Sequence, residues 1–105
     1  MNQYDILNEL TRILEDRKQQ SAKSSYVASL YHKGEDKILE KVGEEAIETI
    51  LASKTGNREK IIYETADLWF HSMIMLAHHN LSADDILQEL ARRFGVSGHD
   101  EKASR

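Results

Sequence analysis

Carboxylate side chains recur at helical spacing in two short stretches of this chain. In the first stretch, Glu44 or Glu45 shares a helix face with Glu48 because residues three or four apart lie on the same side. In the second stretch, Glu64 and Asp67 have the same spacing. If these two faces met, they would form a cage of oxygens whose mutual repulsion requires bound protons or a counter-cation. The sequence therefore predicts a site for a hard ion, Mg²⁺ or Mn²⁺, rather than zinc.

The composition is typical of one globular domain. The chain has 105 residues, of which 40% are hydrophobic and 30% charged, and this balance suits a folded domain with a modest core. The absence of cysteine excludes disulfides, a thiol nucleophile and a thiolate metal site. A net charge of -4 argues against general affinity for nucleic acid. Because no stretch resembles a signal peptide or a membrane span, we expect a cytoplasmic protein with no membrane partner.

Apolar residues recur with the helical period, and no segment alternates like a strand, so the expected fold is all-α. Helices are expected over residues 2–17, 25–31, 35–53 and 58–79, followed by a last helix from Ser82 to Phe94. Residues 17–23 are interpreted as a polar connector, and Gly34 as the end of the second helix. The short turn at 54–57 makes its two flanking helices an antiparallel hairpin.

The expected domain covers residues 1–94. Residues 95–105 have too little apolar content to order themselves, so we expect a flexible tail there.

The helix expected over residues 58–79 is apolar almost all round, which is typical of a helix buried on most sides. Its polar residues fall within a stripe about 60° wide on the helical wheel. Carboxylates are costly to bury unpaired, so a metal or another counter-charge is favoured over solvent along this stripe. The stripe contains Lys60, Glu64, Asp67, His71 and His78.

Each of these groups also has a simpler interpretation. The first acidic stretch, taken alone, fits a solvated helix face that is salt-linked to Lys41. His71 fits a core histidine hydrogen-bonded to an acidic neighbour as well as it fits a phosphate contact. The lysines that precede the first acidic stretch fit solubilising surface charges.

Four stretches of the chain match one family pattern. They are Ser25-Tyr26 with Leu30, Lys33-Gly34-Glu35-Asp36-Lys37-Ile38, Lys41 to Ala46 with Glu48, and Tyr63 to Leu68 with His71. On these residues the chain resembles the phosphoribosyl-ATP pyrophosphatase family, within the all-α NTP pyrophosphohydrolase (MazG-like) superfamily. The resemblance covers nearly the whole chain. Phe70 departs from it, where the family often has Tyr, but this position lies off the acidic stripe.

The resemblance implies Mg²⁺-dependent hydrolysis of the α-β phosphoanhydride of phosphoribosyl-ATP, which yields phosphoribosyl-AMP and pyrophosphate in histidine biosynthesis. The metal-binding and catalytic residues would be Glu44, Glu45, Glu48, Glu64 and Asp67. The substrate-binding residues would be Lys33, Gly34, Lys37, Lys41 and His71. Two alternatives remain: a housecleaning pyrophosphatase for noncanonical or deoxynucleoside triphosphates, and a non-catalytic helical dimerisation module.

The apolar surface predicts a partner subunit. One helical hairpin of this size cannot surround a nucleotide, and the helix over residues 58–79 has more apolar surface than the other helices of the chain can cover. We therefore expect a homodimer in which two copies form a two-fold helical bundle, as is usual in the superfamily.

Overall fold

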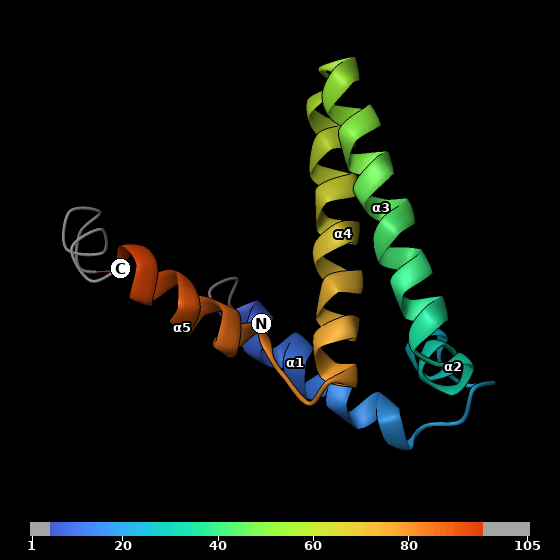
Figure 1. Ribbon diagram of the computed structural model, residues 1–105. Coiled ribbons are helices and arrows are strands. Elements are labelled where there is room, and N and C mark those ends of the chain that lie inside the picture. Colours follow the sequence, from blue (N-terminus) through green and yellow to red (C-terminus); the bar gives the residue numbers. More distant parts are fainter. Residues whose placement is uncertain (1–4, 96–105) are drawn as a thin grey trace.

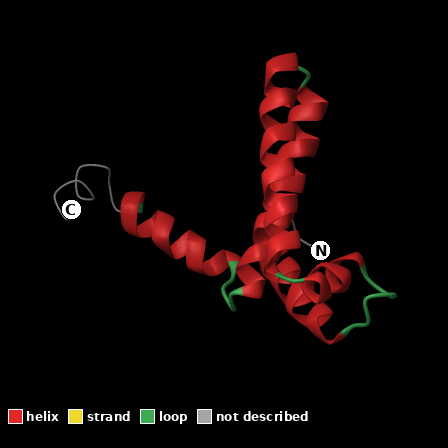
Figure 2. Ribbon diagram, turned by 45° about the vertical axis from the view of Figure 1, so that its right-hand side comes forward, coloured by secondary structure: helices red, strands yellow, loops and turns green. Residues whose placement is uncertain are grey.

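The computed structural model describes residues 5–95, and every regular element within this range is helical (Figures 1 and 2). The all-α prediction is confirmed. The tail expected over 95–105 lies outside the described residues except for Gly95. No described helix is both long enough and apolar enough to cross a membrane. The elements are α1 (Ile6–Asp16), the 3-10 helix η2 (Arg17–Gln19), α2 (Tyr26–Lys33), α3 (Glu35–Thr55), α4 (Arg58–His78) and α5 (Ala83–Phe94).

Capping side chains mark the starts of α2, α4 and α5. The side chains of Ser25 and Asn57 each accept a hydrogen bond from a backbone N–H in the first turn of the helix that follows. At the start of α5, the backbone N–H of Ser82 donates to a carboxylate oxygen of Asp85 at 2.9 Å. Gly34, with φ of 99°, is the single residue between α2 and α3. This conformation favours glycine, which explains how two helices meet at so sharp a junction.

The predicted connector over residues 17–23 begins with a further helical turn. Arg17–Gln19 continue the chain beyond α1 as a 3-10 helix, and the backbone becomes extended at Gln20. No glycine or proline occurs in this stretch to stop the helix earlier. Tightening into a 3-10 turn is common at the end of an α-helix.

Helices α3 and α4 lie antiparallel, side by side along their length, and form the hairpin that the short turn predicts (Figure 1). The buried residues of α3 are Ile38, Glu45 and Ala52, which are spaced seven apart. A spacing of seven residues keeps these positions on one seam of a helix that packs against a neighbour. Glu45 therefore occupies a position in the hairpin where an apolar residue is usual.

The core lies at the base of the hairpin, where α1 and α2 pack against it. The largest fully buried side chains are Leu14 from α1, Leu30 from α2, Ile38 from α3 and Ile74 from α4. In α4, the buried residues all belong to its C-terminal half. The hairpin is therefore anchored at one end.

Within the single chain, α4 is not buried on most sides, in agreement with the prediction that its apolar surface exceeds what the other helices can cover. Ile62, Tyr63 and Trp69 of α4 are 54%, 69% and 60% exposed. Helix α3 covers one side of α4, and the remaining helices meet α4 only around its buried C-terminal half. Helix α5 points away from the hairpin (Figures 1 and 2).

Candidate active site

The hairpin brings one carboxylate of each acidic stretch together. Glu45 of α3, Asp67 of α4 and His71 of α4 each offer a possible ligand atom, and these atoms all lie within 4.8 Å of one another. Glu45 is 8% exposed and His71 is 4% exposed, while Asp67 is half-buried. The seam position of Glu45 points it at α4, and one helical turn separates Asp67 from His71. Of the two acidic faces that were predicted to meet, Glu45 and Asp67 are the members that lie together.

Burial raises the pKa of Glu45. Loss of solvent raises the pKa of the Glu45 carboxyl, and the hydrogen bond and negative charge of Asp67 raise it further. Two carboxyl groups in such contact retain a proton between them or attract a cation. The pair is therefore chemically suited to a hard divalent ion.

The other three predicted ligands do not join this pair in the single chain. Glu44 points outward and forms a 3.1 Å ion pair with Lys41, which lowers the pKa of Glu44. Glu48 is exposed, and Glu64 is half-buried. None of these three belongs to the compact group formed with His71.

Thr49 links the backbones of the two acidic stretches. Its hydroxyl lies 2.7 Å from the carbonyl oxygen of Glu45 and 3.1 Å from that of Glu64. Since the first belongs to α3 and the second to α4, this hydroxyl bridges the hairpin at the level of the acids. The register of the two helices is thereby held where the carboxylates meet.

The predicted phosphate-binding lysines lie on or beside the first turns of α3. Lys33 is exposed at the end of α2, directly before Gly34. Lys37 pairs with Glu40 at 3.3 Å, and Lys41 pairs with Glu44. Lys37 and Lys41 are one turn apart, so they share a face of α3. Exposed pairs of this kind contribute little to stability and exchange readily for another anion.

Comparison with known proteins identifies the family. A family model described as phosphoribosyl-ATP pyrophosphohydrolase matches residues 7–94. The chain belongs to this family. It is also 58% identical over 105 residues to a phosphoribosyl-ATP pyrophosphatase from Hydrogenovibrio crunogenus (strain DSM 25203 / XCL-2), and the match covers 96% of this chain and 93% of that relative. The resemblance seen in the sequence motifs is confirmed.

Phosphoribosyl-ATP pyrophosphohydrolase activity belongs to histidine biosynthesis, and the matched range contains every candidate site residue. The donor set of this pyrophosphohydrolase fits a divalent cation. Carboxylate oxygens are the ligands that Mg²⁺ prefers, and a doubly charged ion would relieve the repulsion between Glu45 and Asp67.

Both ring nitrogens of His71 already have partners. Nδ1 lies 2.9 Å from the backbone carbonyl oxygen of Asp67 and 3.3 Å from its Oδ1. Nε2 lies 2.8 Å from the hydroxyl oxygen of Tyr26. The interpretation of His71 as a buried histidine bonded to an acidic neighbour therefore describes the structure. Tyr26 was missed as a site residue because its contact joins positions 45 apart, although it belongs to a stretch that carries the family resemblance.

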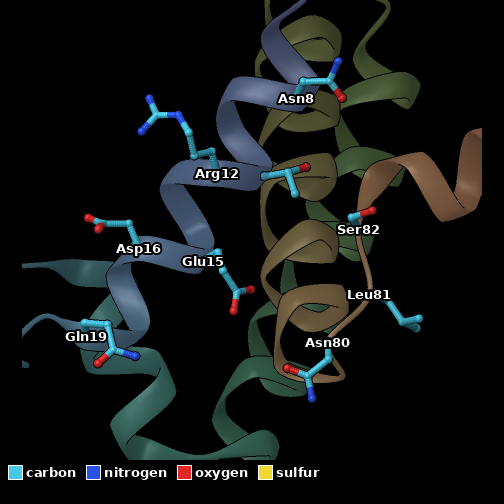
Figure 3. A pocket seen from close by; sticks show the side chains of 9 residues that line it. Asn8, Arg12, Glu15, Asp16, Gln19, Asn80, Leu81 and Ser82 are labelled. Carbon is cyan, nitrogen blue, oxygen red and sulfur yellow. The ribbon is translucent and has the colours of Figure 1, made fainter.

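A polar hollow lies elsewhere, between α1 and the loop before α5 (Figure 3). None of the candidate site residues lines it. The residues that line it are Asn8, Thr11, Arg12, Glu15, Asp16, Gln19, Asn80, Leu81 and Ser82.

Proposed function

We propose that this pyrophosphohydrolase cleaves phosphoribosyl-ATP between its α and β phosphates, as the second step of histidine biosynthesis, and that it requires Mg²⁺. The observation that supports this most is the buried contact between Glu45 and Asp67, one from each acidic stretch of the family pattern. In the proposed site, these two carboxylates hold the ion. Glu44, Glu48 and Glu64 supply further oxygens around it.

The proposed mechanism divides the work between acidic and basic side chains. A bound Mg²⁺ would neutralise charge on the triphosphate and lower the pKa of a coordinated water, and Mn²⁺ could substitute. A carboxylate of the five that is not occupied with metal accepts the proton of the attacking water. Lys33, Lys37 and Lys41 bind phosphate oxygens as point charges. Gly34 has no side chain to obstruct the approach of the nucleotide to its backbone.

A homodimeric bundle is part of the same proposal. Its support is the number of large apolar side chains that the single chain leaves exposed, because exposed apolar surface that forms a patch marks an interface. The bundle would comprise the domain over residues 1–94, in the cytoplasm. The exposed apolar residues include Ile47, Ile50 and Leu51 of α3, Ile62 and Trp69 of α4, and Ile86, Leu87, Leu90 and Phe94 of α5.

Light scattering after gel filtration tests the dimer. We expect the wild type to have twice the mass of one chain, and Trp69→Asp to shift the population toward monomer because a charge enters the apolar surface. Lys23→Asp, on the exposed turn before α2, is the matched control and should remain dimeric. A monomeric wild type would contradict the proposal.

A substrate panel tests the activity. Pyrophosphate release is measured with phosphoribosyl-ATP, ATP and noncanonical or deoxynucleoside triphosphates, with Mg²⁺ and then with a chelator. We expect release with phosphoribosyl-ATP alone, and its loss on chelation. Broad release from nucleoside triphosphates would indicate a housecleaning enzyme, and no release would indicate a non-catalytic module; either result refutes the proposal.

A further inference from the structure

A chain of hydrogen bonds leads from α2 to the acidic pair. Tyr26 is the first residue of α2, and its hydroxyl reaches Nε2 of His71 on α4 at 2.8 Å. The two rings meet edge to face, with centroids 5.8 Å apart. His71 then contacts Asp67, whose carboxylate has an oxygen within 4.8 Å of one of Glu45. Three helices therefore contribute successive members of one connected network.

The acceptors in this network determine where the protons lie. A backbone carbonyl oxygen can only accept, so Nδ1 of His71 must donate to the carbonyl of Asp67. In the neutral ring, Nε2 is then an acceptor, and the hydroxyl of Tyr26 donates to it. Tyr26 is 51% exposed, while the ring of His71 that it contacts is buried. The carbonyl of Asp67 thus selects the tautomer of His71, and the hydroxyl of Tyr26 holds the opposite edge of the same ring.

The Nδ1 edge of the His71 ring lies close to the carboxylate of Asp67. With its proton on Nδ1, the ring faces Oδ1 of Asp67 at 3.3 Å, while the same carboxyl contacts Glu45. His71 is 4% exposed, so solvent offers little competition for these bonds. In metal sites generally, groups that orient a ligand by hydrogen bonding affect metal affinity or activity by about 10–100-fold when mutated.

We propose that Tyr26 is a positioning residue for the metal site, and that it acts through His71 to orient the carboxylate of Asp67 toward Glu45. This inference rests on the proposed metal-dependent function. It assigns His71 to the support of Asp67 rather than to contact with phosphate. It also gives the junction between α2 and the hairpin a part in metal binding.

The variant Tyr26→Phe tests the proposal because it removes one oxygen atom and retains the ring. Two measurements are made: the affinity for Mg²⁺ alone by calorimetry, and the ¹⁵N shifts of the His71 ring by NMR. We expect affinity for Mg²⁺ to fall about tenfold, the low end of the range for such groups because Tyr26 acts through one intermediary. We also expect the shift of Nε2 to change, because this nitrogen loses the hydroxyl that donates to it.

Tyr31→Phe is the matched control. The hydroxyl of Tyr31 donates to the carbonyl oxygen of Leu14 at 2.9 Å, so this variant also loses a partly buried tyrosine hydrogen bond. It should lower the melting temperature without changing the His71 shifts or the affinity for Mg²⁺. If Tyr31→Phe weakens Mg²⁺ binding as much as Tyr26→Phe does, general destabilisation explains both and the proposal fails.

A double-mutant cycle tests whether Tyr26 acts through His71. His71→Asn retains a side-chain amide that can donate to Asp67, but this shorter side chain does not reach the hydroxyl of Tyr26. In that background, Tyr26→Phe should have no further effect on Mg²⁺ affinity; an additive loss would overturn the proposed route. Unchanged affinity and ring shifts in Tyr26→Phe would overturn the inference itself. A wild type that neither binds Mg²⁺ nor releases pyrophosphate would instead refute the proposed function, and the ring shifts still report on the network.

Discussion

Replacing Glu45 by Gln should stabilise the metal-free protein. Glu45 is 8% exposed and its carboxylate lies within 4.8 Å of that of Asp67, so its ionised form places two negative charges together in a site with little solvent. Gln has nearly the same shape, can donate to Asp67, and carries no charge. The variant therefore removes the repulsion while retaining the contact between the helices.

The size of this effect follows from the separation of the two groups. Their oxygens lie within 4.8 Å, and two unit charges at about that distance repel by roughly 3.5 kcal/mol at an effective dielectric constant of about 20. Proton binding relieves part of this repulsion in the wild type. We therefore expect Glu45→Gln to raise the free energy of unfolding by about 1–3 kcal/mol at pH 8. Since 1 kcal/mol shifts the melting temperature of a domain of this size by about 4–8 °C, the melting temperature should rise by about 4 °C or more.

The gain should depend on pH with a definite sign. The folded pKa of Glu45 lies above its unfolded value of 4.5. Its contribution to stability is therefore complete below that unfolded value and is lost as pH rises through the folded value. Glu89, whose pKa is lowered to about 2 by Arg92 and Arg93, stays ionised across this range. The difference between Glu45→Gln and wild type should consequently widen from pH 5.5 to pH 8.

Thermal melts with and without Mg²⁺ complete the assay. A ligand that binds only the folded state adds about 2.7 kcal/mol at a hundred times its Kd, so Mg²⁺ should stabilise the wild type and have less effect on the variant. Glu44→Gln is the control, because Glu44 is exposed and its pKa is lowered by Lys41. It should not stabilise the metal-free protein. If both variants lower the melting temperature at pH 8, the argument from buried charge is refuted.

Three further predictions follow from the site. Asp67→Asn and Glu48→Gln should each abolish pyrophosphate release while circular dichroism shows an intact helical fold; activity retained in both would remove the metal-site assignment. Lys37→Ala should raise KM for the nucleotide severalfold and leave Mg²⁺ affinity unchanged, because its proposed role is binding of ground-state phosphate, and an unchanged KM would make it a surface charge. Gly34→Ala should lower the free energy of unfolding by about 1–3 kcal/mol in a denaturant titration because φ there is 99°, and a loss below about 0.5 kcal/mol would contradict this.

The helix ends were predictable because the chain marks them with strong signals. Gly34 ends α2, the Gly56-Asn57 pair separates α3 from α4, and Ser82 precedes α5. Each acts through local backbone geometry or a capping hydrogen bond, which depend on nearby residues alone. Residues 17–19 contain no such signal, and there the prediction failed.

It was harder to predict which carboxylates form the acidic site, because this depends on how α3 packs against α4. Glu44 and Glu45 are adjacent, and either could share a helix face with Glu48. The structure buries Glu45 and exposes Glu44, a choice fixed by the seam through Ile38 and Ala52. The spacing of seven between those residues was visible in the sequence, but the glutamate between them concealed the pattern. The contact of Tyr26 with His71 joins distant parts of the chain, so no local sequence pattern predicts it.

Anchoring of the hairpin at one end implies a gradient of local stability along it. Of residues 46–66, which form the far part of α3, the turn and the first part of α4, Ala52 alone is buried. Local opening costs least where few apolar contacts are lost, so amide hydrogen exchange should be fastest near the turn and slowest near Ile38 and Ile74. Glu45 and Asp67 lie between the fast-exchanging part near the turn and the slow-exchanging part near the core. Fraying of the hairpin from its tip would therefore reach the metal ligands before it reached the core, and any partner that slows exchange at the tip would also steady the site.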